Sequence, residues 1–197
     1  MKTAIKLAER GWLPDIALRT GIRQMVSRRR RAMQRRAADS VAVGKQVFAR
    51  QLADGPIAVQ TAAANEQHYE VPAKFFEAVL GPRLKYSSCY YPNSQTTLAE
   101  AEEAMLAITC ERADIVDGHD VLELGCGWGS LTLWMAERYP NSHITTVSNS
   151  ASQRLFIESR AREMGLANVR IITADINAFV PPGAYDRIVS VEMFEHL

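Results

Sequence analysis

Two short segments of the sequence combine residue types and spacings that could do chemistry. The first is Glu123-Leu124-Gly125-Cys126-Gly127-Trp128-Gly129, where an acidic residue precedes three glycines at alternate positions. The second is Glu192-Met193-Phe194-Glu195-His196, which puts two carboxylates and an imidazole within five residues. Glycines let a backbone turn tightly and approach a ligand closely, and a carboxylate or imidazole can accept a proton. The sequence therefore predicts a ligand-binding loop and an acid–base cluster.

The glycine segment follows a predicted strand and opens a predicted helix, whose free N–H groups attract an anionic group. A dinucleotide site prefers Gly-x-Gly-x-x-Gly, but Ser130 stands where the third glycine of that pattern would be. The observed spacing, an acidic residue followed by Gly-x-Gly-x-Gly, is the one that S-adenosylmethionine enzymes use. The segment therefore favours S-adenosylmethionine as the cofactor, and a glycine-rich turn without a ligand is the alternative.

Further candidate ligand contacts follow the next two predicted strands. The second strand ends at Ser148-Asn149-Ser150, without the acid that normally binds ribose hydroxyls, which leaves Ser148 and Gln153 for that role. Asp175 follows the third strand, where it could accept a hydrogen bond from an adenine amino group, with Ile176 against the ring. The alternative for Asp175 is the N-cap of a helix.

The acid–base cluster follows the fourth predicted strand. If the chain turns helical there, Glu192, Glu195 and His196 lie at i, i+3 and i+4 and face one way. Such a group could remove a proton from an incoming amine or orient it. A solvated polar turn is the alternative.

The elements that must position these residues alternate between strands and helices. Strands are predicted over 121–124, 143–147, 169–173 and 185–191, and helices over 129–139 and 151–164 separate the first three. This alternation predicts an α/β fold with a parallel sheet and right-handed crossovers. Because the chain stops soon after the fourth strand, we expect the second half of such a domain to be missing.

Helices are also predicted upstream of the sheet. Thr97 followed three residues later by Glu100 is a capping-box signal for a helix to about residue 115. A short helix is predicted over 72–80, with Gly81 as its C-terminal stop. Nearer the N-terminus, one helix opens at Pro14-Asp15 and a second is predicted over 40–53; the aromatic segment 85–93 is predicted to be a loop.

Composition excludes several classes of protein. The chain has 197 residues, 47% hydrophobic and 23% charged, which is ordinary for a globular protein and excludes collagen, disorder and coiled coil. No apolar run approaches the roughly 18 residues of a membrane-spanning helix. The three cysteines are widely spaced without metal-ligand spacing, which predicts no metal site and favours a reducing cytoplasm.

Charge is distributed unevenly along the chain. Residues 1–65 hold 13 Lys or Arg against 4 Asp or Glu, a net of +9, whereas residues 66–197 hold 10 against 18, a net of −8. We therefore expect a basic helical extension over 1–65 and a separate domain over 66–197. Arg28, Arg31 and Arg35 share a helix face that could contact an anionic membrane; a solvated helix is the alternative, and the lack of interleaved aromatic residues argues against nucleic acid.

From His68 to Leu197 the chain resembles the cyclopropane-fatty-acyl-phospholipid synthase superfamily of methyltransferases, which also contains the coclaurine-type N-methyltransferases. The resemblance covers about two-thirds of the chain and is carried by these segments: His68–Pro72, Lys85–Tyr90, Leu124–Ser130, Ser148–Ser150 with Gln153, and Glu192–His196. It implies a Rossmann-like class I methyltransferase sheet, of which this chain supplies the first four strands, preceded by the basic helical region.

The resemblance also implies roles for individual residues. Tyr86 and Ser87 would touch the methionine end of S-adenosylmethionine, Gly125 and Gly127 would form its floor, Ser148 and Gln153 would hold ribose, and Asp175 and Ile176 adenine. Glu123 and Asn149 complete the predicted cofactor-binding set. Glu192, Glu195 and His196 would be the catalytic residues.

Two departures bear on the methyl acceptor. The cyclopropane synthases hold a bicarbonate base with a Glu at the Glu195 position and a Cys in the aromatic loop, where this chain has Ser88 and then Cys89. They also usually lack a Glu at the Glu192 position. Both departures favour methylation of a small amine. Cyclopropanation of unsaturated phospholipid acyl chains and a truncated, non-catalytic cofactor-binding module are the alternatives, and we expect weak or no turnover from these residues alone.

Overall fold

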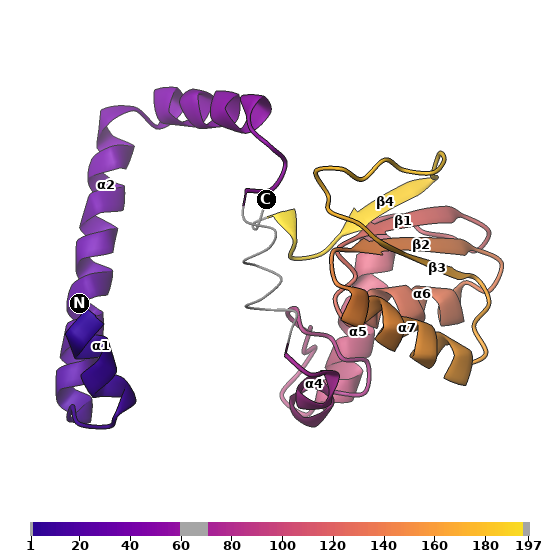
Figure 1. The fold of residues 1–197 in the computed structure, drawn as a ribbon, viewed down its shortest axis with the longest axis horizontal. Coiled ribbons are helices and arrows are strands. Elements are labelled where there is room, and N and C mark those ends of the chain that lie inside the picture. Colours follow the sequence, from indigo (N-terminus) through magenta and orange to yellow (C-terminus); the bar gives the residue numbers. More distant parts are fainter. Residues whose placement is uncertain (1, 60–70, 195–197) are drawn as a thin grey trace. The chain divides into compact units, whose positions relative to one another are not determined.

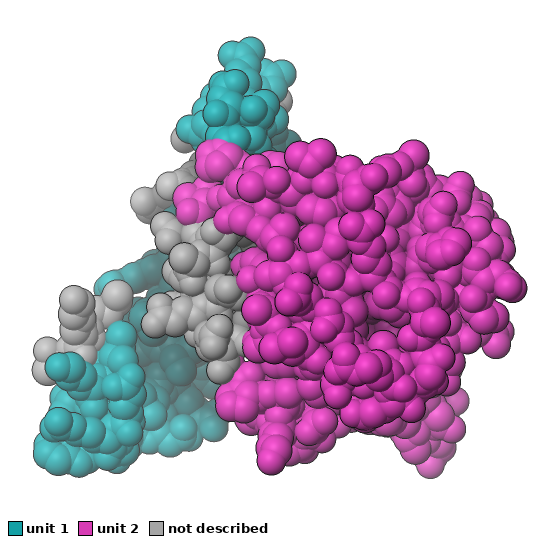
Figure 2. All heavy atoms as spheres, turned by 45° about the vertical axis from the view of Figure 1, so that its right-hand side comes forward, with its two compact units in different colours: residues 1–55 teal, residues 56–197 magenta. Residues whose placement is uncertain are grey.

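A computed structural model of the chain describes residues 2–59 and 71–194, and the side chains of residues 5–34, 45–59 and 71–194. The chain divides into two compact units, Met1–Gly55 and Pro56–Leu197 (Figure 2). The predicted domain boundary at residue 65 falls within 60–70, outside the described residues. Within the described ranges, no helix combines the length and the apolar character needed to cross a membrane.

The first unit consists of two helices, α1 (Lys2–Glu9) and α2 (Asp15–Asp54). Helix α2 begins after Pro14 as predicted, because the fixed φ of proline suits the start of a helix. The prediction of a separate helix over 40–53 is wrong, since these residues belong to the single helix α2. Its residues 36–40 are Arg, Ala, Ala, Asp and Ser, with neither proline nor glycine to end a helix.

The second unit is built on a four-stranded parallel sheet with the order β3-β2-β1-β4 (Figure 1). The strands are β1 (Asp120–Leu124), β2 (His143–Ser148), β3 (Val169–Thr173) and β4 (Arg187–Ser190). Helices α6 (Ser130–Arg138) and α7 (Ala151–Glu163) connect the first three strands, and right-handed crossovers in one direction put both on one face of the sheet. The predicted α/β fold with four parallel strands is confirmed.

Two further helices precede the sheet, α4 (Ala73–Val79) and α5 (Leu98–Arg112). Helix α5 packs beside α6, and its buried Leu106 and Cys110 join the core with Trp134 and Met135. The helix predicted over 72–80 is one residue shorter at each end. Its C-cap is Leu80, in an extended conformation, and Gly81 follows it at C′ without the positive φ of a left-handed glycine stop.

The capping box predicted at Thr97 is confirmed. The Thr97 hydroxyl accepts a hydrogen bond from the Glu100 backbone N–H at 3.3 Å, and a Glu100 carboxylate oxygen accepts one from the Thr97 N–H at 2.8 Å. This exchange satisfies two backbone donors that the first turn of α5 would otherwise leave unpaired.

Replacing Thr97 with alanine is therefore expected to lower the free energy of unfolding by about 1 kcal/mol, as measured by urea denaturation. Thr109→Ala is the matched control, because that hydroxyl bonds to the Met105 carbonyl within the same helix and alanine favours helix. Equal losses from the two substitutions would contradict a specific role for the cap.

Candidate active site

The carboxyl ends of the four strands lie level at one edge of the sheet. Leu124 of β1 is in register with Val147 of β2 and with Ser190 of β4, and Ser148 of β2 pairs with Thr173 of β3. In open α/β sheets, ligands bind at this edge. The loops that follow the four strands therefore form one candidate site.

The glycine loop after β1 has three residues with positive φ: Gly125 at +81°, Gly127 at +52° and Gly129 at +84°. A Cβ at Gly125 would lie 2.7 Å from Met193 Sδ, and one at Gly129 would lie 2.7 Å from Ile157 Cγ1. No heavy atom lies within 4 Å of the position of a Cβ at Gly127. Close packing therefore requires glycine at 125 and 129, whereas Gly127 leaves open space above the backbone.

The start of α6 follows the glycine loop directly and has polar groups to offer. Gly129 is the N-cap and has no side chain to satisfy the N–H groups of the first turn. The Ser130 hydroxyl is buried, and none of the described residues gives it a hydrogen-bond partner. A free helix N-terminus with an unpartnered hydroxyl fits a carboxylate, which is the anionic group of S-adenosylmethionine.

Glu123 lies beneath the glycine loop in the core of the unit. It is 3% exposed, and its carboxylate accepts a hydrogen bond of 2.5 Å from the Thr132 hydroxyl of α6. Burial raises the pKa of Glu123 to about 7, and hydrogen bonds from Thr132 and Thr146 partly oppose this shift. Glu123, which was predicted to contact the cofactor, is therefore a buried side chain whose hydrogen bond joins β1 to α6.

The residues predicted to hold ribose lie together after β2. Both Ser148 and Gln153 are buried, and the Ser148 hydroxyl donates to Gln153 Oε1 at 2.7 Å. Ser148 Oγ also accepts from the Ser150 N–H at 3.1 Å, and Ser150 caps the N-terminus of α7. Asn149, between them in sequence, is half-buried. The loop after β2, which is predicted to contact ribose, is thus held by hydrogen bonds among its own side chains.

The residues predicted to contact adenine lie in the turn after β3. Asp175 is exposed, and its carboxylate accepts a hydrogen bond of 2.8 Å from the Asn177 N–H. Ile176 beside it is half-buried. The alternative that Asp175 caps a helix is wrong, because residues 176–178 form a turn that no helix continues.

The same turn binds Ala58, which lies near the N-terminal start of the second unit. The Asn177 side chain donates to the Ala58 carbonyl and accepts from the Ala58 N–H, each at 2.9 Å. These two hydrogen bonds fix the backbone of Ala58 beside the turn that carries Asp175 and Ile176.

The aromatic loop contacts the glycine loop through a row of rings. Tyr86 packs edge-on against Phe76 of α4 at 5.3 Å, and Phe76 lies 5.3 Å from Trp128 in the glycine loop. Trp128 packs edge-on against Phe156 of α7 at 5.2 Å. Tyr86 itself is 69% exposed, so its ring edge is available to a ligand, and Ser87 follows it half-buried.

Glu192 lies where the chain leaves β4, in contact with the aromatic loop. Its Oε1 accepts hydrogen bonds from the Ser88 N–H at 3.2 Å and the Ser88 hydroxyl at 3.4 Å. The φ of Glu192 is +51°, a left-handed conformation that an α-helix does not contain, so Glu192 itself is not part of a helix. Glu195 and His196 lie outside the described residues.

Sequence reasoning missed two polar residues around this site. Ser130 entered as the residue that breaks a dinucleotide pattern and as the end of a family segment, but not as a ligand contact, although the first position of a helix after a glycine loop indicates one. Glu102 is fully buried on α5, and it lies on one helix face with buried Leu106 and Cys110. A carboxylate in line with apolar residues at i+4 and i+8 is the signal that could have identified it.

Comparison with known proteins connects this geometry to a family. Residues 58–197 match the family model described as mycolic acid cyclopropane synthetase. The chain is 42% identical over 193 residues to the (S)-coclaurine N-methyltransferase of Thalictrum flavum subsp. glaucum, covering 98% of this chain and 54% of that protein. It is 33% identical over 132 residues to the cyclopropane-fatty-acyl-phospholipid synthase of Escherichia coli (strain K12), covering 67% of this chain and 33% of that protein.

A solved structure gives a similar result. The crystal structure of a coclaurine N-methyltransferase bound to N-methylheliamine and SAH superposes with a TM-score of 0.82 at 37% identity, covering 98% of this chain and 55% of that one. The chain thus spans about half the length of the N-methyltransferases that it matches.

Proposed function

The chain belongs to the mycolic acid cyclopropane synthetase family, and from this premise we propose that it acts as an S-adenosylmethionine-dependent N-methyltransferase on a small amine. The predicted family and the predicted class I methyltransferase fold are confirmed. The observation that carries the proposal is a glycine loop with open space over Gly127, followed at the start of α6 by the unpartnered hydroxyl of Ser130.

The proposal assigns the cofactor to the carboxyl edge of the sheet. When bound, S-adenosylmethionine supplies an electrophilic methyl group on its sulfonium. The first turn of α6 and Ser130 would hold its carboxylate, and Tyr86 and Ser87 would border its methionine end. Ser148, Asn149 and Gln153 would hold ribose and Asp175 and Ile176 adenine, while Glu123 supports the glycine loop formed by Gly125 and Gly127.

Glu192 is proposed as the proton acceptor for the incoming amine, together with Glu195 and His196. Ser88 holds the Glu192 carboxylate at the aromatic loop, next to the residues assigned to the methionine end. A carboxylate there would bind an ammonium group and then take its proton, so that the free nitrogen lone pair faces the methyl group. The similarity to coclaurine N-methyltransferase supports this acceptor class.

Calorimetric titration with S-adenosylhomocysteine tests the cofactor assignment. Gly127→Ala and Asp175→Ala are each expected to weaken binding by about tenfold, which corresponds to about 1.4 kcal/mol. Gly118→Ala is the control, because Gly118 also has a positive φ and open space but lies before β1, away from the site. A folded chain that does not bind S-adenosylhomocysteine would contradict the proposal.

A second assay separates the amine from the lipid acceptor, since the similarity to a cyclopropane-fatty-acyl-phospholipid synthase favours lipid as the second candidate. Methyl transfer from labelled S-adenosylmethionine is measured to a cyclic secondary amine and to vesicles of unsaturated phospholipid. We expect label on the amine, and less of it with Glu192→Gln at unchanged cofactor affinity. Label on lipid alone would favour cyclopropanation, and binding without transfer would favour a non-catalytic module.

Membrane contact through α2 and a cytoplasmic location stay predictions. Arg28 and Arg31 are exposed on α2, and the side chain of Arg35 lies outside the described residues. Sedimentation with anionic and with neutral vesicles tests the contact. If α2 contacts a membrane, the chain is expected to sediment with the anionic vesicles, and added salt is expected to release it.

A further inference from the structure

A buried carboxylate underlies the segment that leads into the aromatic loop. Glu102 of α5 has no exposed surface. Its Oε2 accepts a hydrogen bond of 2.9 Å from the Arg83 N–H, and its Oε1 accepts one of 3.0 Å from the Lys85 N–H. One carboxylate therefore binds two alternate backbone donors of the same short segment, and each of its oxygens fixes one of them.

The backbone of this segment is strained, which shows that its conformation is imposed. Leu84 has a φ of +51°, a left-handed conformation that costs a non-glycine residue about 1–2 kcal/mol. Its N–H closes a turn by donating to the Gly81 carbonyl at 3.0 Å. A Cβ at Gly81 would overlap the Glu102 carboxylate, so glycine is required there for close approach. The Glu102 carboxylate supplies the compensating hydrogen bonds on both sides of Leu84.

Lys85 carries this order into the aromatic loop. Its side chain is buried and its ammonium group donates a hydrogen bond to the Ser87 hydroxyl. Burial lowers the pKa of Lys85, while the nearby Cys89, Glu192 and Glu102 raise it. Glu102 thus interacts with Lys85 in two ways: it accepts a hydrogen bond from the Lys85 backbone, and its negative charge favours the charged form of the Lys85 side chain.

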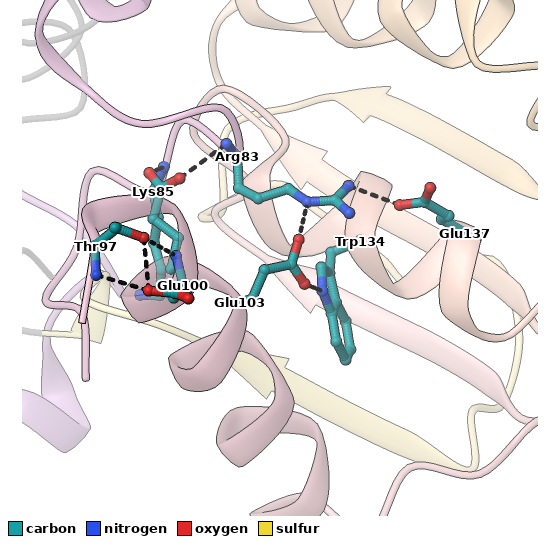
Figure 3. A network of polar contacts seen from close by, with 8 residues as sticks. Arg83, Lys85, Thr97, Glu100, Glu103, Trp134 and Glu137 are labelled. Carbon is teal, nitrogen blue, oxygen red and sulfur yellow. Dashed lines mark hydrogen bonds and ion pairs between the residues drawn. The ribbon is translucent and has the colours of Figure 1, made fainter. Parts of the chain in front are cut away.

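A second set of contacts fixes the outer side of the same segment (Figure 3). The Arg83 guanidinium binds Glu103 of α5 and Glu137 of α6, the latter at 2.6 Å. The other oxygen of Glu103 accepts from the Trp134 ring N–H at 2.5 Å. These contacts hold the side chain of Arg83 against two helices. The backbone N–H groups of the segment are bound by Glu102 instead.

We propose that Glu102 is a positioning residue for the cofactor, which sets the backbone of residues 81–85 so that Tyr86 and Ser87 reach its methionine end. This inference rests on the proposed function, because it takes the methionine end to lie at the aromatic loop. Glu102 touches neither cofactor nor substrate, and it acts through the loop.

Two ligands that share one end and differ at the other test the proposal. S-adenosylhomocysteine carries the amino and carboxylate groups of the methionine end, whereas 5′-deoxy-5′-methylthioadenosine keeps the adenosine and the thioether and lacks them. Glu102→Gln retains the size of the side chain but replaces one accepting oxygen with a donor. We expect it to weaken S-adenosylhomocysteine by about tenfold and methylthioadenosine by less than about twofold in calorimetric titrations.

Glu100→Gln is the matched control, since it makes the same change on the same helix at the exposed capping box and is expected to leave both affinities unchanged. Equal weakening of both ligands by Glu102→Gln would indicate a general structural role and overturn the proposal, as would unchanged affinities. If Glu102→Gln does not fold, Gly81→Ala displaces the segment while keeping the carboxylate, and it must give the same selective loss. An unsubstituted chain that binds neither ligand would contradict the proposed function itself.

Discussion

The Glu123→Gln variant is expected to gain stability relative to the unsubstituted protein as pH rises. The difference between their free energies of unfolding should grow by about 3 kcal/mol from pH 4 to pH 8. The pKa of Glu123 is raised from 4.5 to about 7 in the folded protein, chiefly by burial. The folded state therefore binds this proton more tightly than the unfolded state does. The stabilisation from the protonated carboxyl is complete below pH 4.5 and is lost as pH rises through about 7.

Glutamine has no proton to lose, so the variant escapes this loss. Urea denaturation of both proteins at several pH values gives the difference in free energy of unfolding, in which the other titrating groups cancel. Glu111→Gln, an exposed position on α5, is the matched control. A difference between Glu123→Gln and the unsubstituted protein that stays constant from pH 4 to pH 8 would refute the assignment of a protonated, buried Glu123.

Gly125→Ala is expected to lower the free energy of unfolding by about 2–4 kcal/mol and to abolish detectable S-adenosylhomocysteine binding. Alanine at a φ of +81° is strained, and its Cβ would lie 2.7 Å from Met193 Sδ and 3.1 Å from Met193 Cβ and Cγ. Met193 Sδ can rotate away, but the contact with Met193 Cβ is relieved only if the glycine loop or the segment that carries Glu192 shifts by a few tenths of an ångström. Both segments belong to the proposed site, so stability and binding fall together.

Gly165→Ala separates strain from overlap. Gly165 follows α7 with a φ of +69°, and nothing lies within 4 Å of a Cβ placed there. We expect a loss of only about 1 kcal/mol from backbone strain, with S-adenosylhomocysteine affinity unchanged. Chemical denaturation and calorimetry give both quantities, and equal losses at Gly125 and Gly165 would show that the contact with Met193 is unimportant.

The sheet was the most predictable part of the fold. Strand β3 has the predicted bounds, and β1 and β2 differ from prediction by one residue, because short segments dominated by apolar and β-branched residues between helices indicate strands. The start of α5 was equally clear, since a capping box is a local signal. The prediction of a break within α2 was wrong because no residue type near 36–40 ends a helix. The helix propensity of these residues favours continuation.

The candidate site was predictable where a residue type is demanded by the local backbone, as in the glycine loop. It was not predictable where a distant contact sets the geometry. Gly81 looked like a helix stop, yet it makes room for Glu102, a contact that exists only once α5 has packed. Spacing left open whether Glu192 begins a helix, whereas the structure gives it a left-handed φ and a hydrogen bond from Ser88, which is 104 residues earlier in the sequence.

The pairing of Ala58 with Asn177 bears on the order in which the protein folds. The two residues are 119 positions apart, so Ala58 leaves the ribosome long before the turn that must bind it. Closing so long a loop is entropically costly until β1, β2 and β3 have formed and brought their ends together. The two hydrogen bonds between Ala58 and Asn177 should therefore form late in folding. Asn177→Ala is then expected to speed unfolding and to leave the folding rate nearly unchanged.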